Sequence, residues 1–502
     1  MELNDYLNTY VEYRKKMKAL HLAFFLLSWD SSTVAPKGCF EARGENVAVL
    51  SQMEYELTTA KEFTDAVAYL YDNRDKLDEI TSHEIEVLKE DVDKQLKIPV
   101  EEVMEAAKLF SVANNIWVEA KQTNDFNKFK DCLEKIVAYE RRYVKYLETD
   151  KLKGYDILLD EYERGMTTKE YDQFFDCLKE KLVPFVKKVL AKGNDFDDSF
   201  MKKKYPADKQ KEVCEYFRDV MCFDKNKGIM MESEHPFTSG FGTDDVRITV
   251  HYYEKMFTSS IFSCIHETGH ATYEANVDKK LNETFSGGGA SMALHESQSR
   301  FYENIIARDE NFWKAHFNKL KEVYKTQLKD VDLNTFIREV NKVEASYVRT
   351  EADELTYPLH VMLRYDIEKK LISGELEVKD APKEWNRLFK EYFGLKVKKD
   401  SEGILQDVHW SQGSFGYFPT YALGSAYGAQ FLNAMKKDLD YEKEISKDNL
   451  KTINEWLREH IHKYGASKYP KEIIRIATGE DFNPNYYVDY LINKYSKIYN
   501  IK

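Results

Sequence analysis

Apolar positions recur with a helical period along most of the chain. Between Val103 and Ile116, apolar side chains are spaced three or four residues apart, which places them on one face of a helix. Comparable amphipathic segments follow one another from about residue 3 to residue 230. We therefore expect the first part of the chain to form a scaffold of successive helices.

Residues 228–253 break this helical pattern. Turn-forming residues come first, and the alternating run Val246–Val250 then favours a small hairpin or sheet. Within this run, Arg247 is expected to pair with Asp245 in a structural role. Residues 259–276 return to a helical pattern.

Two later stretches are rich in glycine. Residues 285–289 are expected to form a loop, because no strand clearly precedes them and no phosphate-binding Lys-Ser/Thr pair follows. Helices should then run from Ser291 to about Gly394, and residues 403–428 should interrupt them before the final helices. We expect one catalytic domain over residues 1–502, divided into a helical scaffold (1–230), a metal site and substrate cleft (231–430) and C-terminal helices (431–502).

The composition supports a mainly helical fold without membrane spans. Glycine (21) and proline (10) are scarce for 502 residues, at about half of average usage. No glycine lies between Gly44 and Gly154, so this span should be almost entirely helical. The apolar run Leu20–Leu27 is too short for a membrane span and contains a histidine, so we interpret it as a buried helix.

The net charge limits the classes of binding partner, and the cysteine pattern indicates the redox state of the compartment. The chain carries 87 acidic and 74 basic side chains, for a net charge of −13, which argues against general nucleic-acid binding. The compact basic run Lys202–Lys204 is expected to be a solvated loop. The six cysteines include no C-x-x-C pair and are expected to be reduced thiols in a cytoplasmic protein.

The strongest chemical signal is the His-Glu-x-x-His (HEXXH) pattern of residues 266–270. On a helix, His266 and His270 lie on one face, so both imidazoles can reach one Zn²⁺. Glu267 then lies beside the metal, where it can accept a proton from water. Gly269 is unusual in a helix that serves only as scaffold, because glycine weakens a helix by about 1 kcal/mol relative to alanine.

A catalytic zinc site needs a third protein ligand and one open position. Glu296 and the adjacent His295 are both candidates on the next predicted helix, and only one of them can face the metal. Geometry inferred from the sequence leaves this choice open. Local chemistry favours Glu296, because a carboxylate often completes a site with two helical histidines.

The chain resembles the carboxypeptidase Taq family of zinc metallocarboxypeptidases over essentially its whole length. Near the N-terminus, Trp29-Asp30 resembles an early helix and turn of that family. Six further blocks carry the resemblance in the family's order: His235-Pro236-Phe237, Asp245-Val246-Arg247-Ile248-Thr249, the 266–270 helix, His295-Glu296-Ser297-Gln298, Val348-Arg349-Thr350-Glu351-Ala352-Asp353 and Gly403-Ile404-Leu405-Gln406-Asp407-Val408-His409-Trp410.

This resemblance implies a mainly α, saddle-like zincin fold with a deep cleft and a small antiparallel β-sheet. It implies that Glu296 is the third zinc ligand. It also implies a homodimer that uses Zn²⁺, with Co²⁺ as a substitute.

Recognition of a substrate's C-terminal carboxylate calls for an arginine, whose planar fork matches a carboxylate. Arg349 is the candidate, from the family block that contains it, and the alternative is an internal ion pair with Glu351 or Asp353. Glu267 is expected to be the general base that also carries the proton to the leaving amine.

Other polar residues are candidates for oxyanion stabilisation and substrate contact. His409 and Tyr421 are each expected to donate a hydrogen bond to the oxyanion, with Tyr417 as the alternative tyrosine. His235 is expected either to contact substrate or to make a structural hydrogen bond. Asp407 is expected to orient a ligating histidine.

These features predict a zinc carboxypeptidase that releases single C-terminal amino acids from peptides with broad specificity. One alternative is an oligoendopeptidase or dipeptidyl carboxypeptidase built on a similar helical cleft. A second alternative is a peptide-binding protein that has lost catalysis, which the intact Glu267 and metal ligands argue against.

Overall fold

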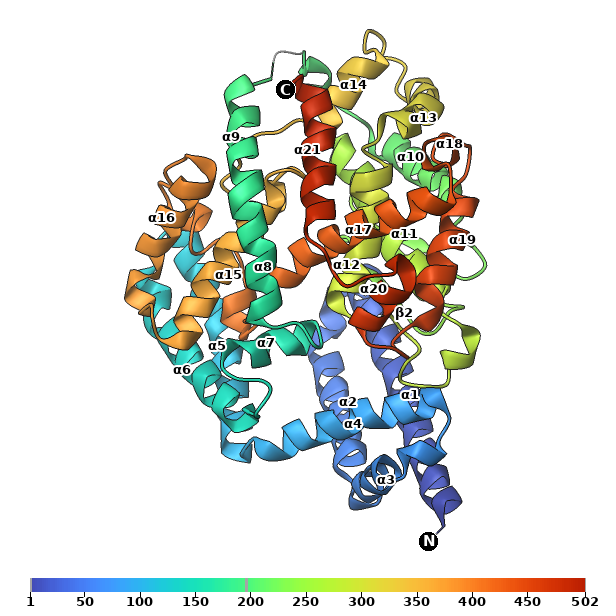
Figure 1. The fold of residues 1–502 in the computed structure, drawn as a ribbon, viewed down its shortest axis with the longest axis vertical. Coiled ribbons are helices and arrows are strands. Elements are labelled where there is room, and N and C mark those ends of the chain that lie inside the picture. Colours follow the sequence, from blue (N-terminus) through green and yellow to red (C-terminus); the bar gives the residue numbers. More distant parts are fainter. Residues whose placement is uncertain (1, 195–196, 502) are drawn as a thin grey trace.

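Helices joined by short turns make up most of this computed structural model, which describes residues 2–194 and 197–501 (Figure 1). The helices that precede the sheet are α1 (Leu3–Thr33), α2 (Phe40–Thr59), α3 (Lys61–Asp72), α4 (Glu79–Lys97), α5 (Val100–Thr123), α6 (Asn127–Leu147), α7 (Tyr155–Tyr162), α8 (Thr168–Cys177), α9 (Val183–Lys192) and α10 (Ala207–Val220). The predicted helical scaffold is confirmed, and so is the nearly unbroken helical span between Gly44 and Gly154.

Helices resume after the sheet. They are α11 (Phe257–Ala275), α12 (Met292–Arg300), α13 (Glu310–Val323), α14 (Leu333–Val340), α15 (Tyr357–Ser373), α16 (Ala381–Phe393), α17 (Phe418–Asp438), α18 (Tyr441–Glu444), α19 (Lys451–His460), α20 (Pro470–Thr478) and α21 (Asn485–Tyr499). Across the described residues, no helix combines the length and the apolar character that a membrane crossing requires.

The small sheet lies where the sequence predicts it but differs in topology. It contains β1 (Met230–Glu232), β2 (Thr238–Gly240) and β3 (Val246–Val250) in the order β1-β3-β2. The strands β2 and β3 are antiparallel, whereas β1 and β3 are parallel, so the sheet is mixed and not wholly antiparallel. The alternating pattern of residues 246–250 predicts a strand but does not specify the direction of its neighbours, and the additional strand β1 pairs in parallel.

One continuous apolar core joins the helices from α5 to α21, and a smaller core joins α1, α3 and α4. In Figure 1 the N-terminal helices occupy the lower end, while α11, α12 and α17 lie together within the body. The predicted mainly helical fold is therefore confirmed. The deep cleft implied by the family resemblance stays a prediction.

Two boundaries differ from the sequence prediction. Residues 341–356, expected to be helical, contain only one short 3₁₀ turn at Arg349–Glu351. Residues 418–428, expected to interrupt the helices, form the first half of α17. The second error has a steric cause, because the glycines of this segment permit close helix packing and do not mark a loop.

Two helical glycines set the spacing of the helices that carry the site. A Cβ atom on Gly269 of α11 would lie 2.8 Å from Ser299 Cα of α12, which is too close for a stable contact. A Cβ atom on Gly424 of α17 would lie 2.7 Å from Glu296 Cβ. Since only glycine lacks this atom, α12 is held closely between α11 and α17.

Candidate functional site

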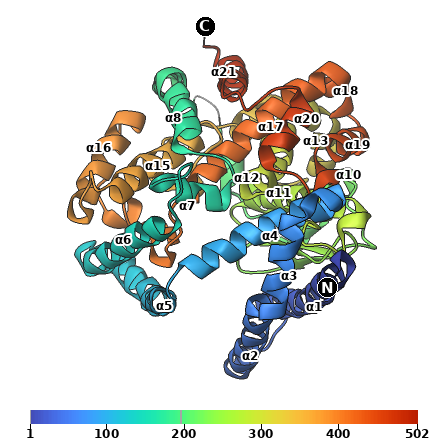
Figure 2. The same ribbon diagram turned by 60° about the horizontal axis from the view of Figure 1, so that its bottom comes forward.

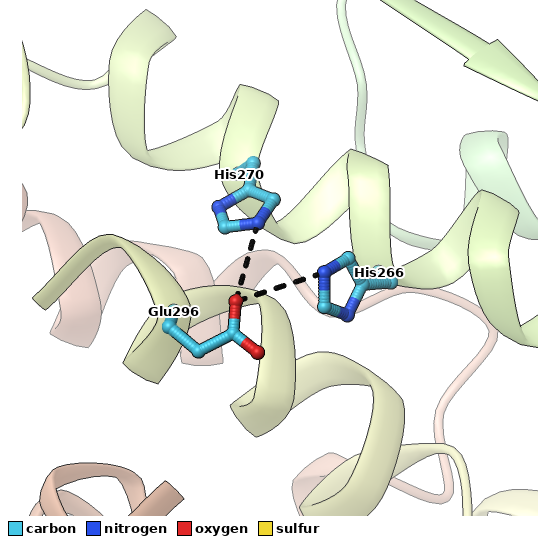
Figure 3. Close-up of side chains that lie close together, drawn as sticks. All are labelled: His266, His270 and Glu296. Atoms are coloured by element: carbon cyan, nitrogen blue, oxygen red, sulfur yellow. Dashed lines mark ion pairs between the residues drawn. The ribbon is translucent and has the colours of Figure 1, made fainter. Parts of the chain in front are cut away.

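Three side chains from two adjacent helices face one point (Figure 3). His266 and His270 come from successive turns of α11, and Glu296 comes from α12. The Nε2 atoms of the histidines lie 3.9 and 3.8 Å from Glu296 Oε2, distances too long for hydrogen bonds. These residues are also the group of potential metal ligands found among the described residues.

A carboxylate outside the triad fixes the orientation of His266. Glu303 Oε2 lies 2.9 Å from His266 Nδ1. A proton on Nδ1, donated to this carboxylate, leaves the Nε2 lone pair free to bind a cation. Glu303 lies in the π-helical segment Phe301–Ile306 that follows α12. The sequence analysis missed this residue, although its position two helical turns after Glu296 places both carboxylates on the same side of the helix.

A longer chain of contacts fixes His270. His270 Nδ1 lies 2.7 Å from His295 Nδ1, and His295 Nε2 lies 2.6 Å from Glu274 Oε1. If His295 donates its Nε2 proton to Glu274, its Nδ1 accepts from His270 and leaves His270 Nε2 free. Glu296, and not His295, therefore faces the two histidines. Sequence reasoning missed Glu274, which lies one helical turn after His270.

Arg300 joins Glu296 to this surrounding network. Its Nε donates to Glu296 Oε1 at 2.7 Å, and its Nη1 lies 3.2 Å from Glu303 Oε2. Burial would raise the pKa of both carboxyl groups, but Arg300 and His266 together outweigh it and hold both pKa values below their ordinary range. Both groups are therefore carboxylates, able to balance a cation.

Glu267 lies beside the triad and is almost fully buried. The hydroxyl of Thr238 in β2 lies 2.6 Å from Glu267 Oε2. Burial raises the pKa of Glu267, and this effect exceeds the opposing effects of His266 and Thr238. A carboxylate with a raised pKa is a better proton acceptor than an ordinary surface glutamate.

A second polar cluster is built around Asp407. Arg349 Nε and Nη2 donate to Asp407 Oδ1 at 3.1 and 2.9 Å, while Arg364 pairs with Oδ2. The prediction that Asp407 orients a ligating histidine is therefore wrong, because both of its oxygens are engaged by arginines. The internal partner of Arg349 is Asp407, and not Glu351 or Asp353.

The Asp407 cluster carries an excess positive charge. Burial alone would raise the pKa of Asp407, but Arg364 and Arg349 together hold it below its ordinary range. One carboxylate thus faces two guanidinium groups, and neither arginine is more than one-tenth exposed. A buried charge of this kind favours the binding of an anion.

Tyr357 connects the two clusters. Its hydroxyl accepts a hydrogen bond from Arg349 Nη1 at 3.0 Å, and the Arg300 guanidinium lies 4.6 Å from its ring centre. Arg300 in turn contacts Glu296. The cationic cluster and the metal-ligand triad therefore belong to one continuous site.

The two predicted oxyanion donors lie beside the cationic cluster. His409 Nε2 is 3.3 Å from the Tyr421 hydroxyl, and the Arg349 guanidinium lies 4.9 Å from the Tyr421 ring centre. Burial lowers the pKa of His409 to about 4, so the ring is neutral at pH 7. The ring of Tyr417, the alternative donor, lies 5.1 Å from that of Tyr421.

The predictions for Arg247 and His235, two residues near the sheet, compare differently with the structure. Arg247 makes a bidentate pair with Asp245 at 2.7 and 2.6 Å, as predicted for a structural pair. The side chain of His235 is exposed, and its backbone carbonyl accepts a hydrogen bond from Ser233 Oγ at 2.6 Å. Both alternatives for the His235 side chain stay predictions.

The donor set fits a divalent cation. Two imidazole nitrogens and one carboxylate oxygen form the ligand set found in many hydrolytic zinc sites. The Nδ1 atoms of both histidines are engaged by neighbouring residues, and burial leaves His270 with a pKa well below its ordinary value. His270 is thus held in the neutral form that can bind a metal. At His266 burial lowers the pKa but Glu303 and Glu296 together raise it, so a cation bound there would displace a proton.

Comparisons with known proteins agree over nearly the whole chain. A family model described as carboxypeptidase Taq (M32) metallopeptidase matches residues 9–495. Carboxypeptidase 1 of Bacillus subtilis is 42% identical over 500 residues, covering 99% of this chain and 100% of that protein. Thermostable carboxypeptidase 1 of Pyrococcus furiosus is 35% identical over 492 residues, covering 96% of each chain.

Solved structures show the same similarity. The M32 carboxypeptidase from Deinococcus radiodurans R1 superposes with a TM-score of 0.94 at 31% identity, over 99% of this chain and 100% of that one. Metallocarboxypeptidase 1 of Trypanosoma cruzi superposes with a TM-score of 0.94 at 32% identity, over 98% of this chain and 100% of the other.

Proposed function

The chain belongs to the carboxypeptidase Taq (M32) metallopeptidase family and is a metallocarboxypeptidase, and from this premise we propose that it releases single amino acids from peptide C-termini with broad specificity. We assign the metal to His266, His270 and Glu296. We also propose zinc as the native metal, with cobalt as a substitute, because the donor set has two nitrogens and one oxygen. When bound, such a cation acts as a Lewis acid that polarises the scissile carbonyl and makes water more acidic.

Glu267 is the proposed general base. Its buried carboxylate accepts a proton from the attacking water and then delivers that proton to the leaving amine. Burial supports this role because it raises the pKa of Glu267 and strengthens its affinity for a proton. The Thr238 hydroxyl engages only one of its carboxylate oxygens, Oε2.

Arg349 is the proposed receptor for the substrate's C-terminal carboxylate. The observation that carries this proposal is the buried pairing of two arginines, Arg349 and Arg364, with the single carboxylate of Asp407. A substrate carboxylate would neutralise the remaining positive charge. His409, held neutral by burial, and Tyr421 are the proposed donors to the oxyanion, and His235 is proposed to contact the substrate at its exposed position.

The oligoendopeptidase and dipeptidyl carboxypeptidase alternatives are less well supported. Internal cleavage does not require a receptor for a free carboxylate close to the metal. The contact of Tyr357 with both Arg349 and Arg300 supports a receptor near the metal ligands, as the release of single residues requires.

Two peptides that differ only at the C-terminus test this function. We expect amino-acid release from the free-acid peptide and not from its C-terminal amide, with loss of activity on chelation and recovery with zinc or cobalt. Release of dipeptides would favour the dipeptidyl alternative, and internal cleavage of both peptides would favour the endopeptidase. Failure to cleave either peptide despite bound metal would contradict the proposed function.

We propose that the chain forms a homodimer through α1 and α2, which project from the rest of the molecule (Figure 2). None of the twenty residues of α2, all of which the structure describes, is buried. Val49 and Met53 on α2 are 57% and 48% exposed. A helix normally gains most of its stability by packing an apolar face against another element. The α1 and α2 helices of a second copy of the chain would provide such a partner for α2.

We further propose a cytoplasmic location and a single catalytic domain over residues 1–502, with the subdivisions stated above. All six cysteines lie in the described part of the chain as free thiols, which supports a reducing compartment. The continuous core from α5 to α21 supports one catalytic unit.

A further inference from the structure

Thr238 contacts Glu267 through two atoms of the glutamate. Its Oγ1 lies 2.6 Å from the carboxylate oxygen Oε2 and 3.0 Å from the backbone carbonyl oxygen. Within the described residues, the other carboxylate oxygen, Oε1, accepts no hydrogen bond. The contact therefore joins edge strand β2 to the helix that carries the metal ligands.

We infer that Thr238 is a positioning residue that holds the Glu267 carboxylate in the orientation needed for proton transfer. This inference rests on the proposed role of Glu267 as general base. A glutamate side chain has three rotatable bonds, and a hydrogen bond from a fixed hydroxyl removes much of that freedom. Because the hydroxyl engages only Oε2, the carboxylate keeps Oε1 for the proton of the attacking water.

The neighbouring strand fixes the position of Thr238. Thr249 of β3 donates its backbone N–H to the Phe237 carbonyl at 2.9 Å, and its Oγ1 accepts the Phe237 N–H at 2.9 Å. Ser233 Oγ also lies 2.7 Å from Thr249 Oγ1, within hydrogen-bond distance. Thr249 is fully buried, so these bonds hold the residue preceding Thr238 at both of its backbone polar groups.

Helix α1 packs against Phe237, the residue that precedes the same strand. The ring of Trp29 lies 5.6 Å from that of Phe237 in an edge-to-face contact. The Arg247 guanidinium lies 4.9 Å from the Phe25 ring centre and 5.5 Å from that of Trp29, while Asp245 holds it in a bidentate pair. The strand that carries the Thr238 hydroxyl is thus supported by residues from three of the sequence blocks noted above, at 29–30, 235–237 and 245–249.

Substitution of the hydroxyl by a methyl group tests the inference. Thr238→Val preserves the shape of the side chain, and we expect kcat to fall roughly 10- to 100-fold, with KM changed less than about twofold, because a hydrogen bond to a charged group is lost. Thr238→Ser restores the hydroxyl, so its kcat should recover to within about threefold of wild type. If the methyl group of Thr238 mattered instead, Thr238→Val would keep a higher kcat than Thr238→Ser.

Two further variants and two other measurements complete the test. Thr243→Val is the matched control, because Thr243 is buried near the same sheet and bonds to Asn282 and not to Glu267. Its kcat should stay at the wild-type value. Thr249→Val should lower kcat in the same direction as Thr238→Val but less strongly. Metal affinity and the thermal midpoint of Thr238→Val should match those of wild type.

Wild-type kcat in Thr238→Val would overturn the inference, as would failure of Thr238→Ser to recover. Loss of metal affinity in Thr238→Val would also overturn it, because the residue would then support the ligands and not the base. Failure of the wild-type enzyme to release amino acids would instead contradict the proposed function, so the two failures are distinguishable.

Discussion

Replacement of Glu303 by glutamine should weaken metal binding although Glu303 is not a ligand. Its carboxylate lies 2.9 Å from His266 Nδ1 and also pairs with Arg300 and Arg308. Glutamine keeps an oxygen that can accept the His266 proton, but it removes the negative charge. The imidazole becomes a weaker donor to the cation, and two partly buried arginines lose part of their charge compensation.

The size of the effect follows from the role of such supporting carboxylates. Loss of one of them typically lowers metal affinity 10- to 100-fold, which corresponds to about 1.4 to 2.7 kcal/mol. The contact at 2.9 Å and the burial of Glu303 favour the upper part of this range. Three ligands remain in place, so binding should weaken without being abolished.

Competition of the metal-free protein with a chromophoric chelator gives the affinity directly, without any activity measurement. Glu84→Gln is the matched control, since Glu84 is also a buried carboxylate paired with an arginine, Arg14, at 2.8 Å. It joins α1 to α4, and its other oxygen accepts the backbone N–H of Phe285 in the connection between α11 and α12, outside both helices. This control should lower the thermal midpoint and leave metal affinity unchanged. Equal metal affinities in Glu303→Gln and wild type would show that Glu303 does not support His266, and so would equal losses of affinity in Glu303→Gln and Glu84→Gln.

Three other predictions concern packing, pH and assembly. Gly424→Ala should lower the thermal midpoint and weaken metal binding at least tenfold, because the new Cβ would lie 2.7 Å from Glu296 Cβ; wild-type values in both measurements would refute this. Burial raises the pKa of Glu140 from 4.5 to about 9, so its contribution to stability is full below pH 4.5 and is lost as pH rises towards 9. Glu140→Gln should therefore raise the thermal midpoint relative to wild type at pH 8–9 and not at pH 4.5, and a pH-independent difference would contradict the assignment. The double substitution Val49→Glu and Met53→Glu should give monomers by light scattering with the thermal midpoint of each chain retained, whereas an unchanged mass would contradict the proposed interface.

The helical class and the pairing of His266 with His270 on one helix face were predictable because both depend on local spacing. Helical periodicity identified the scaffold, and the four-residue separation of His266 and His270 placed them on one face. The third ligand was not fixed by spacing alone. The contact of His295 with Glu274, a tertiary feature, leaves Glu296 to face the histidines.

Other features could not be predicted because one sequence signal has more than one physical cause. Gly424 was interpreted as part of a loop, yet its missing side chain lets α17 approach α12 inside a helix. Asp407 was assigned to a ligating histidine, although two arginines distant in sequence occupy both of its oxygens. Thr238 gave no signal of its own, since its importance depends on strand pairing and on the packing of α1.

Metal titration of the wild type beside Glu267→Gln and Glu296→Gln, combined with amino-acid release from a free-acid peptide, separates the proposed base from the proposed ligands. We expect Glu267→Gln to bind one metal ion per chain with an affinity close to that of wild type but to release no amino acid. Glu296→Gln should lose most of its metal affinity and its activity together. Hydrolysis by Glu267→Gln would contradict the role of Glu267 as general base, and wild-type metal affinity in Glu296→Gln would contradict the role of Glu296 as a ligand.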